Sequence, residues 1–126
     1  MPVGILMIDW DVQKGPFLNY ALPNDLDITT GLLTQIYSAH RYYSLEAGIS
    51  SITFHNYRIV SFFSGLEGEI IEDPNHVLAM LLRKDEKIGA FKKILLQDMK
   101  AIFSAIPSGK YKDLMEDTFE KMKKTS

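Results

Sequence analysis

Asp9 and Asp11 come nearest, in residue type and spacing, to an arrangement that could do chemistry. Side chains alternate along a strand, so both carboxylates of the segment Asp9-Trp10-Asp11 would point to the same side. Such a pair could bind a metal ion or serve as general acid and base in a hydrolase. The sequence places no third ligand at a matching spacing, and charged residues commonly mark the point where a strand leaves the core. We therefore favour a solvated strand end over a catalytic pair.

The histidines indicate structural roles rather than metal binding. His40, His55 and His76 are far apart in the sequence and lack the partners at i+4, or the companion carboxylates, that metal motifs contain. Cysteine is absent, which removes thiolate metal sites, disulfides and cysteine nucleophiles. We predict hydrogen-bonded or surface histidines, no bound metal and no cofactor.

The glycine-containing segments do not form a nucleotide or nucleophile motif. Ser108-Gly109-Lys110 is similar to the end of a phosphate-binding loop, but the earlier glycine is missing and Tyr111 stands where that loop has serine or threonine. Acidic residues around the segment 65–68 would repel phosphate. No GxSxG nucleophile elbow occurs. We therefore predict that the protein is not an enzyme.

Length and composition are those of one globular domain. The chain has 126 residues, of which 46% are hydrophobic and 24% charged, so we predict a single domain over residues 1–126. A net charge of −2 gives no broad positive field, and nucleic acid is not an expected partner. The apolar N-terminus turns acidic after a few residues, which does not suit a signal peptide or membrane span. A cytoplasmic protein is expected.

Five segments have the patterns of β-strands. Two are apolar on both alternating sets of residues, which is typical of strands covered on both faces and predicts a central position. A third is bracketed by Pro16 and Pro23, and because proline cannot donate to a sheet, we expect it at an edge. The central strands are 3–10 and 76–83, the proline-flanked strand is 17–22, and a second hairpin joins 49–56 to 58–65.

Three segments have helical periodicity, with the first of them expected to be capped by Asp27. The apolar residues of this first helix span an arc of about 180°, wider than the stripe of about 100° that packing on one sheet requires. We therefore expect an uncovered flank around Leu33, Tyr37 and Tyr42. The predicted helices are 28–44, 88–106 and 110–124.

The resulting element order is β-β-α-β-β-β-α-α. Placing the first strand beside the last satisfies the burial of both and gives the spatial order 2-1-5-4-3, with the third strand at an edge. The predicted fold is α+β, with a five-stranded, mainly antiparallel sheet and helices on both faces.

This order resembles the longin fold over nearly the whole chain. The similarity rests on element order and strand character: one long helix follows the second strand, and two helices follow the fifth. The related roadblock domains begin with a helix, whereas this chain begins in a strand, Pro2-Val-Gly-Ile-Leu-Met-Ile. The resemblance implies a non-catalytic platform in vesicle trafficking that binds a small GTPase. It also implies a homodimer, or a heterodimer with another longin or roadblock domain, that pairs through the first helix and third strand. Membrane contact would be only indirect.

The residues of the third strand also favour an interface at this edge of the sheet. Between Gly48 and Tyr57 there is no Lys, Asp, Glu or Pro, the residues that usually stop an exposed edge from pairing with another strand. The structural alternative is that the charged segment 66–75, or Tyr57 with Arg58, protects this edge. We predict an interface formed by Leu33, Tyr37, His40, Arg41, Tyr42, Ser50, Ile52, Phe54 and Asn56.

A second function stays open, that of a small-molecule-sensing domain. Five-stranded sheets flanked by helices of the profilin-like kind also bind small ligands. This alternative requires a pocket lined by aromatic residues such as Trp10, Tyr20 and Phe62.

Overall fold

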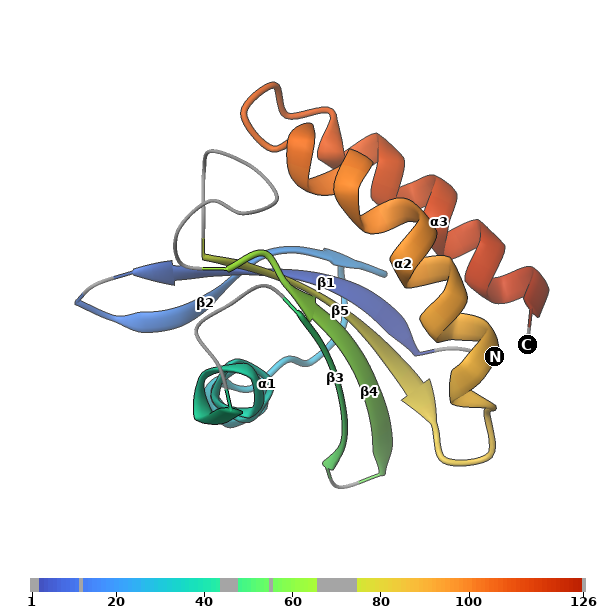
Figure 1. Ribbon diagram of the computed structural model, residues 1–126, viewed down its shortest axis with the longest axis horizontal. Coiled ribbons are helices and arrows are strands. Elements are labelled where there is room, and N and C mark those ends of the chain that lie inside the picture. The colour runs from blue at the N-terminus through green and yellow to red at the C-terminus, as the bar shows by residue number, and fades with distance from the viewer. Residues whose placement is uncertain (1–2, 12, 44–47, 55, 66–74, 126) are drawn as a thin grey trace.

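Five antiparallel strands form one sheet in the order β2-β1-β5-β4-β3 (Figure 1). The computed structural model describes residues 3–11, 13–43, 48–54, 56–65 and 75–125. The strand order is the one predicted, and each neighbouring pair is antiparallel. The strands are β1 (Gly4–Asp11), β2 (Gly15–Leu22), β3 (Gly48–Phe54), β4 (Tyr57–Phe63) and β5 (His76–Arg83).

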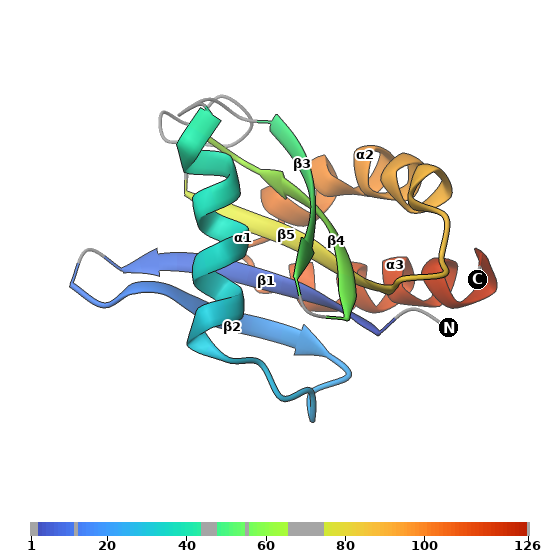
Figure 2. The same cartoon turned by 90° about the horizontal axis from the view of Figure 1, so that it is seen from below.

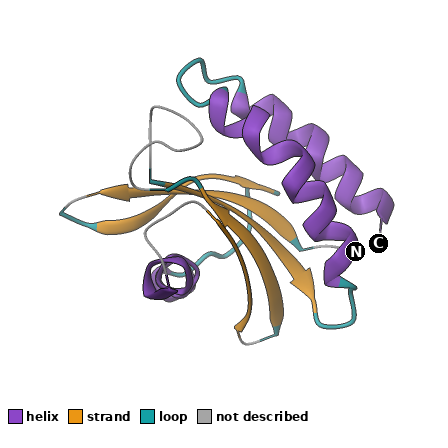
Figure 3. Cartoon of the chain, viewed as in Figure 1, coloured by secondary structure: helices purple, strands orange, loops and turns teal. Residues whose placement is uncertain are grey.

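Helices cover both faces of the sheet (Figures 1 and 2). α1 (Thr30–Tyr43) lies on one face, while α2 (Ile88–Ser104) and α3 (Tyr111–Thr125) pack together on the other. Figure 3 shows the resulting three layers, with the sheet between the two sets of helices. The fold is therefore α+β with the predicted element order. In the described ranges, no helix is long and apolar enough to cross a membrane.

The two central strands separate two apolar cores. In β1, Ile5 and Met7 contact the core beneath α2 and α3, whereas Leu6 and Ile8 contact the core beneath α1. All four side chains are fully buried. β5 alternates in the same way. A strand covered on both faces needs apolar residues at every position, which explains the patterns in segments 3–10 and 76–83.

β2 occupies the edge that its prolines predicted. The strand extends slightly further toward the N-terminus than expected, because Pro16 lies opposite Trp10 within the ladder. Gly15 opens the strand at a φ of +84°, a conformation that side chains larger than hydrogen disfavour. A register shift between Met7 and Ile8 marks a bulge in the β1–β2 pair.

The first helix begins later than predicted. Its first residue is Thr30, and Thr29 rather than Asp27 caps it: Thr29 Oγ1 accepts a hydrogen bond of 3.1 Å from the backbone N–H of Leu32. Asp27 is exposed and lies before the helix. The expectation that Asp27 caps α1 is therefore wrong, and the helix begins two residues later than predicted, which is about half a turn.

Candidate functional site

β3 forms the edge of the sheet opposite β2 and, within the described strands, pairs with β4 only. Burial alternates along it. Ile52 and Phe54 pack against the core on the α1 side, and Ser50, which shares their face, is also half-buried. Ile49, Ser51 and Thr53 point to the opposite face and are exposed, Ile49 lying opposite Phe62 of the core beneath α2. One side of this edge is thus anchored, and the other is open to solvent.

Within the described strand, no side chain gives the outer edge of β3 the usual protection against strand pairing. The segment Gly48–Phe54 contains no Lys, Asp, Glu or Pro. Tyr57 and Arg58 lie on β4, opposite Phe54 and Thr53, and thus on the inner side of the strand rather than beyond its edge. Asn56 is exposed in the turn that follows β3. The other proposed cover, segment 66–74, lies outside the described residues.

The flank of α1 that was expected to be free is covered. Leu33, Tyr37 and His40 are only 5%, 3% and 7% exposed, so the prediction of an uncovered surface at Leu33 and Tyr37 is wrong. Figure 1 shows the reason, because the sheet curves around α1 and leaves it in a hollow. α1 consequently contacts β2, β3 and β4. The side chains of Arg41 and Tyr42 lie outside the described residues.

Aromatic contacts complete the packing around α1. The Tyr37 ring stacks on Trp10 of β1 with 4.8 Å between ring centroids and meets Phe63 of β4 edge to face at 5.7 Å. The Tyr37 hydroxyl donates a hydrogen bond to the side-chain oxygen of Asn75, just before β5. Asn75 adopts a φ of +76°, which asparagine tolerates better than most residues. Tyr37 is therefore a core residue that joins the helix to β1, to β4 and to the residue that precedes β5.

His40 is held in the same core in its neutral form. Its Nε2 lies 2.8 Å from Ser61 Oγ, and its ring packs near Phe63. Burial lowers the pKa of His40 from 6.5 to about 4, because the interior disfavours the imidazolium. The interpretation of His40 as a hydrogen-bonded histidine agrees with this geometry.

Acidification is expected to destabilise the protein through His40. Between pH 6.5 and 4 the unfolded chain binds a proton at this ring that the folded protein does not. The contribution to stability is therefore complete above pH 6.5 and is lost as pH falls toward 4. The difference in pKa corresponds to about 3 kcal/mol. Chemical denaturation at several pH values in this window should show the loss, and His40→Gln should reduce its slope. Equal slopes for the two proteins would contradict the assignment.

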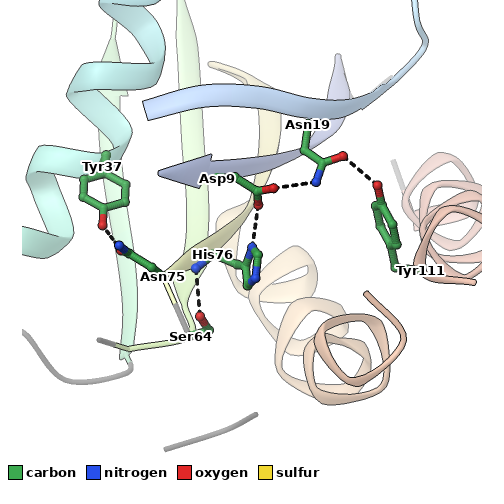
Figure 4. A network of polar contacts seen from close by, with 7 residues as sticks. All are labelled: Asp9, Asn19, Tyr37, Ser64, Asn75, His76 and Tyr111. Atoms are coloured by element: carbon green, nitrogen blue, oxygen red, sulfur yellow. Dashed lines mark hydrogen bonds and ion pairs between the residues drawn. The ribbon is translucent and has the colours of Figure 1, made fainter. Parts of the chain in front are cut away.

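Asp9 is the centre of a polar network at the end of the sheet where β1 ends and β5 begins (Figure 4). Its Oδ1 lies 2.5 Å from His76 Nδ1, and its Oδ2 accepts a hydrogen bond of 2.6 Å from the side-chain amide of Asn19. Asn19 Oδ1 in turn accepts a hydrogen bond of 2.6 Å from the Tyr111 hydroxyl. Ser64 Oγ accepts one of 2.9 Å from the backbone N–H of His76. The network joins β1, β2, β5 and α3.

These contacts change the interpretation of two sequence motifs. His76 was expected to lack a carboxylate companion, which is wrong, since β1 and β5 place Asp9 directly opposite it. Asp11 accepts hydrogen bonds from the backbone N–H groups of Gln13 and Lys14, which lower its pKa, as expected of a solvated strand end. The two aspartates therefore have separate partners and do not form a pair.

The geometry of the network indicates a structural role, in which hydrogen bonds hold three strands and α3 together. A carboxylate beside Nδ1 fixes the orientation of the His76 ring. Burial, and next the charge of Asp9, raise the pKa of Tyr111, so its hydroxyl keeps the proton that it donates to Asn19. Within the described part of the chain, no three His, Asp or Glu side chains are grouped to hold a metal ion.

The aromatic residues proposed for a ligand pocket do not converge. Trp10 packs with the core beneath α1, whereas Tyr20 and Phe62 pack with the core beneath α2 and α3. The sheet separates them, so the pocket expected from these three residues is not formed. A groove of about 360 Å³ lies instead between α2 and α3, lined by Gln97, Asp98, Ala101, Ile102, Leu114, Asp117, Thr118 and Lys121.

No protein-family model and no curated protein matches this chain. The support for a function therefore comes from the residues of β3 and of the helix beside it.

Proposed function

We propose that the protein is a non-enzymatic, longin-like interaction platform that pairs through the edge of β3. The observation that carries this proposal is an edge strand without protective side chains, anchored on one face by α1 and exposed on the other. The five-stranded order 2-1-5-4-3 with one helix on one face and two on the other supports the longin resemblance. By that resemblance, the complex serves vesicle trafficking and binds a small GTPase.

The partner fitted to this edge is a second copy of the chain or another longin or roadblock domain. Two β3 strands related by a two-fold axis would run antiparallel and join the sheets into one. The outward-pointing backbone N–H and C=O groups would then be satisfied by the partner strand. Ser50, Ile52 and Phe54 on the α1 side, with Asn56 at the turn, would lie along the junction. Leu33, Tyr37 and His40 would support it from within the core and make no direct contact.

Sedimentation velocity across a range of protein concentrations tests the pairing. The expected result is a dimer that dissociates on dilution. A chain that stays monomeric at high concentration, alone and when mixed with longin or roadblock domains, would contradict the proposal. Ligand sensing, the other function considered, loses the aromatic pocket on which it rested.

A further inference from the structure

The outer face of α2 carries lysines that form no ion pair with a carboxylate of the described residues. Lys92, Leu96 and Lys100 follow at intervals of four residues, and Lys93 lies three residues before Leu96, so all four share one side of the helix. No described acidic side chain lies within ion-pair distance of these three lysines. On α3, by contrast, Lys121 and Lys123 form ion pairs. The outer side of α2 is thus a strip of uncompensated positive charge.

The one acidic residue of α2 is turned away from this strip. Asp98 faces α3, where it accepts hydrogen bonds of 2.7 Å from Thr118 Oγ1 and 3.0 Å from Lys121 Nζ. The distribution of charge along the whole sequence is also uneven. Residues 83–126 hold eleven basic and seven acidic residues, and residues 1–82 hold three basic and nine acidic ones. The net charge of −2 therefore conceals an excess of four basic residues in the segment 83–126, which contains α2 and α3.

Helix stability does not explain the placement of these lysines. Lys92 and Lys93 lie in the first half of α2, and the exposed Lys87 immediately precedes it, near the positive end of the helix dipole. The first turn contains no acidic residue and the last turn no basic one. A helix whose charges served its own stability would show the opposite arrangement. The lysines are therefore available for a contact outside the domain.

Leu96 indicates the kind of contact. It is 48% exposed, the highest value among the large hydrophobic side chains of the described residues. α2 and α3 form one of the two outer helical layers of the molecule (Figure 1), and the outward side of a helix is convex across its axis. The groove beside it runs on the flank toward α3 and is lined by Asp98 and Asp117 rather than by the strip. A convex ridge with a leucine between lysines fits a flat, deformable, negatively charged surface better than it fits a peptide, which needs a groove.

We propose that the outer face of α2 binds a membrane surface rich in anionic lipid, with Leu96 inserted among the lipid chains and the lysines on the headgroups. Lys92, Lys93 and Lys100 lie within about one helical turn of the leucine, so they reach the headgroup region together. The contact is direct, unlike the indirect one expected from the sequence. It is also independent of pairing through β3, because it uses a different element and the opposite side from α1.

Flotation with vesicles tests the proposal. The protein is expected to bind vesicles of phosphatidylcholine mixed with phosphatidylserine, to ignore phosphatidylcholine alone, and to bind less as salt rises. Lys93→Glu with Lys100→Glu should lower the partition coefficient by about tenfold or more. Leu96→Gln should lower it by about threefold or more. These residues are exposed, and thermal unfolding would confirm that each variant folds.

A matched control removes the same charge elsewhere. Lys14→Glu with Lys110→Glu changes two exposed lysines outside α2 and should leave vesicle binding nearly unchanged. Equal losses in the two double variants would show a general charge effect and overturn the assignment to α2. Failure of the wild-type protein to bind phosphatidylserine vesicles at low salt would overturn membrane binding itself. Binding of polyglutamate without vesicle binding would favour an acidic protein partner instead. Sedimentation velocity on each variant measures its oligomeric state, so a loss of vesicle binding can be distinguished from a loss of pairing through β3.

Discussion

Leu33→Glu is expected to unfold much of the domain rather than to disturb a surface. Leu33 is 5% exposed and lies in the core between α1 and the sheet with Leu32 and Ile36. Glutamate there would forfeit the apolar contacts and bury a carboxylate without a designed partner. The expected loss is at least about 3 kcal/mol, a large part of the stability of about 5–15 kcal/mol typical of single domains. Urea denaturation followed by circular dichroism measures it.

Thr34→Glu provides the matched control on the same helix. Thr34 is the next residue and is exposed, so the same new charge should change the free energy of unfolding by less than about 0.5 kcal/mol. If Leu33→Glu were as harmless as Thr34→Glu, Leu33 would belong to a free flank of α1, as the sequence pattern alone suggested. The comparison therefore tests directly whether the sheet encloses the helix.

The periodicity of apolar residues and the positions of proline were sufficient to predict the architecture. Segment 76–83 was predicted with the bounds that β5 has, because a short run that is apolar on both alternating sets has few other structures open to it. The prolines around β2 predicted its edge position equally directly, because proline has no N–H group to donate to a neighbouring strand. These signals are local, and the sheet order follows once both buried strands are placed side by side.

The predictions of the uncovered flank and of the N-cap of α1 failed because both depend on how separate elements are arranged in space. The arc of α1 was measured correctly against a flat sheet, but the curvature of the sheet brings β2, β3 and β4 around the helix. Asp27 and Thr29 are both suitable caps, and the path of the chain after β2 selects the second. No local pattern of residues predicts the curvature of the sheet or the path of this segment.

The contact between Asp9 and His76 was closer to being predictable. The sequence already placed strands 3–10 and 76–83 side by side in a mainly antiparallel sheet, and the structure shows that this pair is antiparallel. Setting their apolar residues against each other puts the end of one strand beside the start of the other, which is where Asp9 meets His76. No local motif contains this pair, because its members are 67 residues apart in the sequence. The pair follows only from the register between the two neighbouring strands.

Ser51→Lys is expected to weaken the proposed dimer strongly while leaving the monomer intact. Ser51 is the exposed middle residue of β3, so in the monomer a lysine there meets only solvent and should change stability by less than about 0.5 kcal/mol. In a two-fold antiparallel pair, the middle residues of the two strands come near each other. The two lysines would then repel across the junction, as edge lysines do in natural sheets.

The expected increase in the dimer dissociation constant is about tenfold or more, because juxtaposed like charges at an interface are costly. Sedimentation equilibrium measures it, and added salt should recover part of the affinity by screening the two lysines. Ser104→Lys is the matched control, since it places the same side chain at an exposed position at the end of α2. A dissociation constant that Ser51→Lys leaves unchanged would place the contact between subunits away from β3. A loss seen with Ser51→Lys and absent with Ser104→Lys would support an interface at the edge strand, where the absence of protective residues first suggested it.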